Sequence, residues 1–258
     1  MQWYTIFEKE LVENWRNRKW IWVPLVFILV AVMDPVTYYF LPQIIELSGG
    51  LPEGAVLEMP KMQPAEVAAT SLESLSTYGI VILALFTMGA ISGEIKSGVI
   101  EMILVKPVKY SHYITAKWSA NALLILTALF LGIGLSWYYV NLLFGKLSVA
   151  SFFLTVLLFV LWFCLFLSIS LFYNVLFKAP GAVAACTIGT YFLMNFADMI
   201  MGNKWSWFPN QMFSHLQEVL MTKHVTGDVW GTAFIMLLTT VILLVIAITI
   251  FRKKEISH

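Results

Sequence analysis

Charged residues are scarce in this 258-residue chain: Asp, Glu, Lys and Arg make up 12% of it, against 60% hydrophobic residues. A soluble domain carries roughly a quarter charged residues, so the composition excludes a soluble domain and indicates an integral membrane protein in contact with lipid. The formal net charge is only +1, which leaves no basic surface for nucleic acid.

The sequence also lacks the common motifs of catalytic and nucleotide-binding sites. It has no Gly-x-x-x-x-Gly-Lys-Ser/Thr loop, so we expect the chain not to bind ATP phosphates itself. It has no His-Glu-x-x-His or Gly-x-Ser-x-Gly motif, and its histidines lie near loops or the tail, where solvated positions are expected. The two cysteines, Cys164 and Cys186, lie within apolar segments and predict neither a disulfide nor a metal site. We therefore expect no enzyme activity and no cofactor bound by this chain.

Six apolar segments are long enough to cross a membrane as helices, which need about 20 residues each. Because these segments are continuously apolar and do not alternate, we predict an all-α, polytopic membrane protein with six transmembrane helices. Asp34-Pro35 is expected to bend or break the first segment. The second is the weakest, since it is short and contains several polar residues. The segments are 20–41, 75–92, 118–140, 151–177, 181–201 and 229–251.

Lys and Arg residues are distributed unequally between the two sides of these segments. Twelve of the 16 lie in the N-terminal stretch, the connector 93–117, the turn at 178–180 and the C-terminal tail. The positive-inside rule then predicts a cell-membrane protein with both termini and the connector on the cytoplasmic side. The first outer loop is acidic, in agreement with this orientation. Its acidic residues are Glu46, Glu53, Glu58, Glu66 and Glu73.

Residues 1–19 are predicted to form an amphipathic interfacial helix ahead of the permease-like region 20–258. Aromatic and apolar residues recur every four positions there and would share one helix face among the lipid headgroups. Two interpretations remain open: a membrane anchor only, or an elbow helix that also braces a cytoplasmic partner. The residues of this face are Trp3, Phe7, Leu11 and Trp15.

The connector 93–117 is more elaborate than a loop between two membrane helices requires. Its apolar residues recur at helical spacing among charged ones, so we predict an amphipathic helix over 94–106. Pro107 would end this helix, and Ser111 would cap the next one. A charged helix at the membrane surface suggests docking to a partner. The apolar face comprises Ile95, Val99, Met102 and Ile103.

Taken in order, these features resemble the permease subunit of the ABC-2 type transporter family, with its N-terminal amphipathic helix, six spans and cytoplasmic termini. The connector resembles the family's loose pattern, although the family usually has Thr where this chain has Val99. The outer segment 205–223 resembles the short outer helices that such permeases place before the sixth span, as an interfacial or re-entrant helix. The matching connector residues are Glu94, Gly98, Glu101, Leu104, Pro107 and Lys117.

The resemblance implies a division of labour between subunits. A separate ATPase subunit, which would bind ATP and magnesium, is expected to dock on the connector, and two permease copies or paralogues would form an export path. The alternative from another class is a secondary transporter or channel that needs no ATPase, but the spans show no charged relay. The implied coupling residues are Glu94, Ile95, Gly98, Val99, Glu101, Met102, Leu104 and Pro107.

Polar residues within the spans are few. Asp34, Asn195 and Asp198 are expected either to line a translocation path or to be hydrated near the outer interface, because an ionisable group at depth is costly.

A stripe of small residues marks the fifth span. Gly181, Ala185 and Gly189 repeat every four residues, a spacing that lets two helix backbones approach closely. The stripe would pack either within the chain or against a second permease copy.

Overall fold

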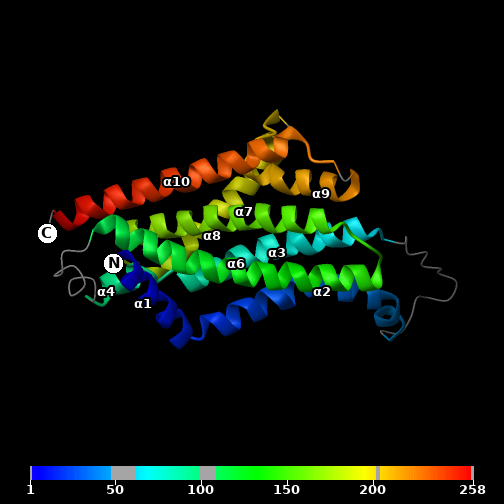
Figure 1. The fold of residues 1–258 in the computed structure, drawn as a ribbon, viewed down its shortest axis with the longest axis horizontal. Helices are drawn as coiled ribbons and strands as arrows, with labels where there is room; N and C mark the ends of the chain where they lie inside the picture. The colour runs from blue at the N-terminus through cyan, green and yellow to red at the C-terminus, as the bar shows by residue number, and fades with distance from the viewer. Residues whose placement is uncertain (1, 48–61, 99–108, 202–203, 223, 257–258) are drawn as a thin grey trace.

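The computed structural model of the protein describes residues 2–47, 62–98, 109–201, 204–222 and 224–256. Long helices lie side by side along one axis, and α1 and the end of α10 lie at the same end of the bundle (Figure 1). No strand occurs within these described ranges, which confirms the all-α class. Six of the described helices are long and apolar enough to span a membrane, as predicted.

The helices follow the predicted order along the chain. The spans are α2, α3, α6, α7, α8 and α10, and the second apolar span continues through a turn into the short α4. The elements are α1 (Gln2–Arg16), α2 (Lys19–Leu47), α3 (Pro64–Thr87), α4 (Ser92–Lys96), α6 (Tyr110–Leu143), α7 (Val149–Leu176), α8 (Pro180–Met201), η2 (Pro209–Gln211), α9 (Met212–Thr222) and α10 (Gly227–Ile256).

The second span is longer than the sequence predicted. Helix α3 begins at Pro64, because proline fits the first helical position and Gln63 and Glu66 form a capping box. The backbone N–H of Gln63 donates to Glu66 Oε2 at 3.0 Å. Glu66 and Glu73, assigned above to an outer loop, therefore lie on a helix.

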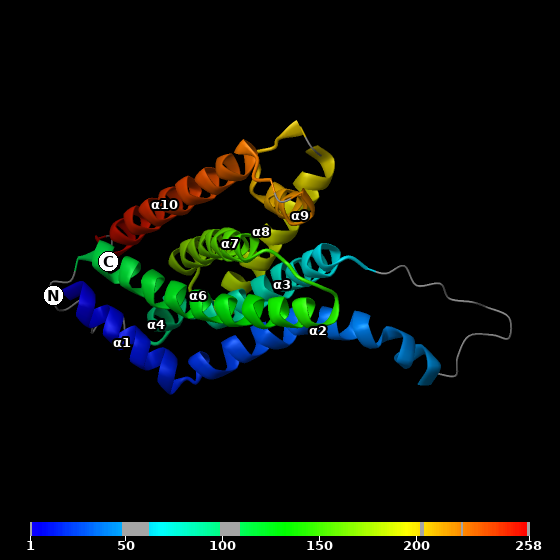
Figure 2. The same cartoon turned by 45° about the vertical axis from the view of Figure 1, so that its right-hand side comes forward.

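Helix α2 runs without a break through Pro35, so of the two expectations for Asp34-Pro35, a bend or a break, the break is wrong. The helix changes direction between its two ends (Figure 2). A proline inside a helix removes one backbone hydrogen bond and bends the axis, and α2 also contains Pro24 and Pro42.

The core lies where α2, α3, α6 and α7 cross. Gly132 lets α6 approach the backbone of α2, since a Cβ at Gly132 would lie 3.1 Å from the Phe27 carbonyl oxygen. The rings of Phe27 and Phe163 pack with their centroids 5.5 Å apart, and Trp162 is fully buried. Close backbone approach of this kind supplies much of the packing energy between membrane helices.

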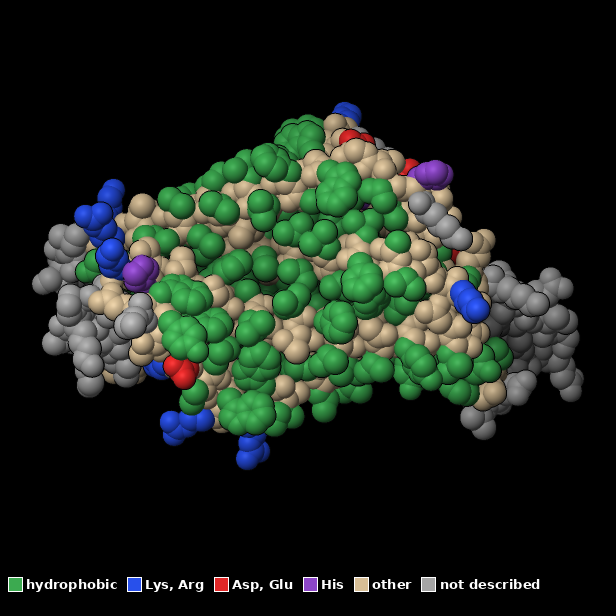
Figure 3. All heavy atoms as spheres, viewed as in Figure 1, with side chains coloured by type: hydrophobic (Ala, Val, Ile, Leu, Met, Phe, Trp, Pro, Cys, Tyr) green, Lys and Arg blue, Asp and Glu red, His purple; other side chains and the backbone are tan. Residues whose placement is uncertain are grey.

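Large hydrophobic side chains remain on the outside of the bundle, as lipid contact requires. Hydrophobic side chains cover the middle of the face in Figure 3, and Lys and Arg gather mainly toward its ends. On α8 and α10 the most exposed of them include Phe192, Leu193, Phe196, Met199, Phe234, Leu237 and Val245.

Candidate functional site

A buried group of charged side chains joins α1, α4 and α6 at the end of the bundle that carries the N-terminal helix. Lys117 of α6 is only 1% exposed. Its Nζ donates to Glu10 Oε1 of α1 at 2.7 Å and to Glu94 Oε1 of α4 at 3.0 Å. One ammonium group therefore connects three helices. We call Lys9, Glu10, Glu13, Glu94, Tyr113 and Lys117 the junction cluster.

A second lysine adds a positive charge to the junction cluster. Lys9 Nζ lies 2.9 Å from Glu94 Oε1, 3.4 Å from Glu10 Oε1 and 3.5 Å from Glu13 Oε2. Burial by itself would lower the pKa of Lys9. The hydrogen bond to Glu94 and the charges of the three carboxylates outweigh burial and raise that pKa above its ordinary value. Lys9 therefore stays charged at neutral pH.

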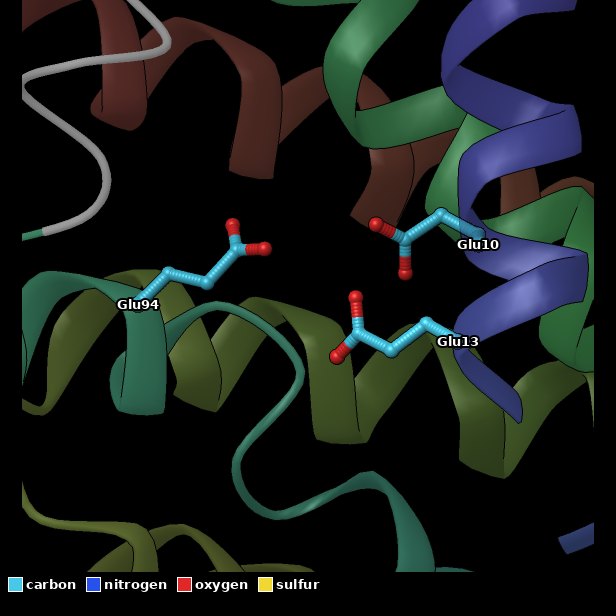
Figure 4. Close-up of side chains that lie close together, drawn as sticks. All are labelled: Glu10, Glu13 and Glu94. Atoms are coloured by element: carbon cyan, nitrogen blue, oxygen red, sulfur yellow. The ribbon is translucent and has the colours of Figure 1, made fainter. Parts of the chain in front are cut away.

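The three carboxylates of the cluster point toward one another (Figure 4), and one oxygen from each lies within 4.8 Å of the other two. That spacing would suit a metal ion. However, Lys9 contacts all three carboxylates and Lys117 contacts Glu10 and Glu94. Two ammonium groups already balance most of the negative charge, so the arrangement is an ion-pair network within the chain.

Two further contacts extend the cluster to α10. The Tyr113 hydroxyl donates to Glu94 Oε2. The Tyr113 ring stacks on Phe251 of α10, with centroids 5.5 Å apart and an interplanar angle of 10°. A displacement of Glu94 would therefore disturb α10 as well as α1 and α6.

Helix α1 buries a polar face, which the sequence interpretation missed. Glu10 and Asn14 are 4% and 3% exposed, whereas Trp15 is 65% exposed. Asn14 Nδ2 donates to Asn121 Oδ1 at 3.5 Å, beside the Glu10–Lys117 pair. The available signal was a matching spacing: Glu10 and Asn14 are four residues apart, as are Lys117 and Asn121, so each pair shares one helix face.

Asn174 of α7 holds the turn that presents α4, and it is fully buried. Its Oδ1 accepts the backbone N–H groups of Ile91 and Ser92, both at 3.1 Å. Its Nδ2 donates to the carbonyl oxygens of Thr87 and Ser170, both at 3.0 Å. The side chain thus satisfies four backbone groups where the helical path is interrupted.

The predicted coupling helix over 94–106 is wrong as a continuous helix. Helix α4 ends at Lys96, and Gly98 adopts a φ of +73°, a left-handed conformation that ends helices and favours glycine. Ser111 is not the cap of the next helix, because α6 begins at Tyr110 with Lys109 as its N-cap.

The predicted coupling residues fall into two groups. Glu94 and Ile95 lie on α4, where Glu94 pairs within the chain and Ile95 packs against the core. The others, apart from Gly98, lie outside the described residues: Val99, Glu101, Met102, Leu104 and Pro107.

At the opposite end of the bundle (Figure 1), α3, α8, η2 and α9 line a partly open cavity of about 550 Å³. Asn195 and Asp198 line it, whereas Asp34 is not among its lining residues. Asn210 Nδ2 donates to Asn195 Oδ1 at 3.1 Å, and Gln211 Nε2 donates to Asp198 Oδ1 at 2.6 Å. The structure therefore brings together two of the three predicted path residues.

Helix α9 lies within the segment 205–223, for which the sequence predicted a short helix. Its apolar face is buried, through Met212, Leu216 and Leu220. His215 is 8% exposed and bonds to the Ser206 carbonyl oxygen at 2.8 Å. The expectation that every histidine is solvated is therefore wrong for His215, because this loop folds back over the bundle.

The small-residue stripe of α8 faces away from the rest of the described chain. Gly181 and Ala185 are exposed. A Cβ built at Gly181 or Gly189 would meet no heavy atom of the surrounding described residues within 4 Å. The described contacts thus give no support to packing of the stripe within one chain, and its contact with a second copy stays a prediction.

Six helices long and apolar enough to cross a membrane make this a multi-pass membrane protein. The chain belongs to the ABC-2 transporter family: the family described as ABC-2 family transporter protein matches residues 4–256. The chain is also 29% identical to the "Uncharacterized transmembrane protein YxlG" of Bacillus subtilis (strain 168), over 97% of each chain. The resemblance noted in the sequence is thus confirmed.

Proposed function

We propose that the chain is the transmembrane permease subunit of an ABC-2 type exporter. In this proposal a separate ATPase subunit binds ATP and magnesium, and two permease copies or paralogues form the path. Family membership supports the permease role. The observation that carries the coupling role is the junction cluster, in which buried Lys117 ties α4, the start of the connector, to α1 and α6.

The cluster suits the transmission of movement from the connector to the spans. Asn174 fixes the turn before α4 to α7, and Glu94 fixes α4 to α1 and α6 through Lys117. Because Asn174 and Lys117 are buried and hydrogen-bonded, a shift of α4 would either break these contacts or move the neighbouring helices. An ATPase that pulls on the connector would therefore move several spans at once, with α1 acting as a brace.

Purification of the tagged full chain from its native membrane tests the proposal. We expect an ABC ATPase subunit to co-purify and to hydrolyse ATP. The Lys117→Met variant should lower coupled transport relative to the Lys109→Met control, whose lysine is exposed. If the chain alone moves a solute across the membrane of ATP-free liposomes, the result would instead support a secondary transporter or channel.

In the proposed orientation the chain spans the cell membrane and both termini lie on the cytoplasmic side. Lys146 follows the end of α6, Arg252 lies in the last turns of α10, and both are exposed. These two helix ends lie at opposite ends of the bundle (Figure 1), so each residue can be replaced by cysteine in a chain without Cys164 and Cys186. An impermeant thiol reagent should label Lys146→Cys in intact cells and leave Arg252→Cys unlabelled. The reverse pattern would invert the topology. Ser48 and Ser257, two further positions for an introduced cysteine, lie outside the described residues.

A further inference from the structure

The cavity between α3, α8, η2 and α9 is strongly biased toward negative charge. Glu66, Glu73 and Asp198 line it, and none of its described lining residues is Lys, Arg or His. Low-dielectric walls around charges of one sign strengthen their field and concentrate counter-ions. The electrostatics therefore favour a positively charged occupant.

Two buried polar side chains that line the cavity have atoms without a partner. Ser76 and Asn210 are 2% and 4% exposed. Among the described residues, Ser76 Oγ and Asn210 Oδ1 have no hydrogen-bond partner. Buried polar groups are nearly always paired. Both atoms are able to accept a hydrogen bond from an N–H donor, which is the group that an ammonium supplies.

The spacing of the carboxylates and the size of the cavity argue against a bare metal ion. Within the described ranges, the group of three potential metal ligands that converge within 4.8 Å lies in the junction cluster, so Glu66, Glu73 and Asp198 do not converge in this way. The cavity, at about 550 Å³, has the size of a small-molecule site. Its aromatic lining can hold a cation against ring faces. The aromatic residues are Tyr191, Phe192 and Phe213.

We propose that this cavity binds an organic ammonium or a similar lipophilic cation, either a free solute or the headgroup of an amine-bearing lipid. That this cation is also the transported substrate rests on the proposed function, because transport requires the chain to act as a permease. The dispersed carboxylates supply the charge, the unpaired Ser76 and Asn210 oxygens accept N–H groups, and the rings cover the organic part.

Binding of ethidium to the purified full chain in dodecyl maltoside, followed by fluorescence anisotropy, tests the charge requirement. Glu73→Gln and Asp198→Asn should each weaken binding about three- to tenfold, because each removes one partly shielded charge. Glu218→Gln is the matched control, since Glu218 lies on α9 but does not line the cavity. Unchanged affinity in the double variant, or equally tight binding of the anion 8-anilinonaphthalene-1-sulfonate at the same site, would overturn the proposal.

Competition identifies the source of the cation. Displacement of ethidium by dihexanoylphosphatidylethanolamine, but not by dihexanoylphosphatidylglycerol, would support a lipid headgroup. Displacement by neither would support a free solute.

The two proposals fail separately. If the affinity for ethidium is unchanged in the carboxylate variants while an ATPase still co-purifies, the cavity proposal is overturned and the permease proposal stands. If binding depends on the carboxylates but no ATPase co-purifies, the cavity stands as a cation site and the ATP-driven role is overturned.

Discussion

Lys117 Nζ lies 2.7 Å from Glu10 Oε1, although 107 residues separate them in the chain. Both side chains are buried, at 1% and 6% exposure. A buried ion pair is costly to form, but removing one partner costs more, because the other charge is left unpaired. The pair is therefore weak evidence for overall stability and strong evidence that α1 has one fixed position against α6.

The first prediction concerns this pair. Lys117→Met should destabilise the folded chain by about 3–5 kcal/mol, because Glu10 and Glu94 lose their buried cation. Thermal unfolding in detergent, followed by tryptophan fluorescence, measures the loss. Lys109→Met, at an exposed position, should change little. Equal unfolding temperatures for the two variants would show that Lys117 does not contribute to the stability of the folded chain.

The second prediction concerns the turn before α4. Asn174→Leu removes four hydrogen bonds and leaves the N–H groups of Ile91 and Ser92 buried without an acceptor. We expect a loss of about 2–5 kcal/mol, since each orphaned group costs about 1–3 kcal/mol and part of the turn can relax. Asn17→Leu, at an exposed position, is the control. Hydrogen exchange at residues 88–96 should rise in Asn174→Leu alone; protection equal to wild type would exclude the anchoring role.

The spans were predictable because their length and continuous apolarity are fixed by the thickness of the membrane. The start of α3 was not, because Glu66 and Glu73 look like loop residues until their helix is seen to enclose a polar cavity. The polar signal at Asn195 and Asp198 was visible, since polar residues stand out in an apolar run. The carboxylates of α3 that join them depend on how two distant helices pack.

The junction cluster was predictable only in part. The importance of Glu94 followed from the resemblance, but its partner did not, because the pairing with Lys117 and Glu10 exists only once α1 lies against α6. The helix expected over 94–106 failed for a local reason. Periodicity carried the pattern across Gly98, whose positive φ ends the helix regardless of the apolar residues that follow.

The third prediction compares two glycines on α6. A Cβ at Gly132 would lie 3.1 Å from the backbone oxygen of Phe27, whereas a Cβ at Gly134 would meet nothing within 4 Å. Both Ala variants gain the same helix propensity, roughly 1 kcal/mol. Gly132→Ala should therefore be less stable than Gly134→Ala by about 1–3 kcal/mol, the usual cost of overpacking. Thermal unfolding of the two variants measures the difference, and identical values would mean that α2 and α6 are not in close backbone contact.

The fourth prediction concerns assembly. If the stripe of α8 meets its copy in a second permease subunit, a cysteine at Ala185 should crosslink to itself in a chain without Cys164 and Cys186. Phe234→Cys, exposed on α10, controls for random collision and should crosslink poorly. Adding Gly189→Leu should abolish the Ala185→Cys crosslink, since a side chain's width between the backbones costs on the order of a few kcal/mol of association. If the yield at 185 does not exceed that at 234, the symmetric pair must be abandoned, and the exposed stripe faces lipid or a paralogous permease.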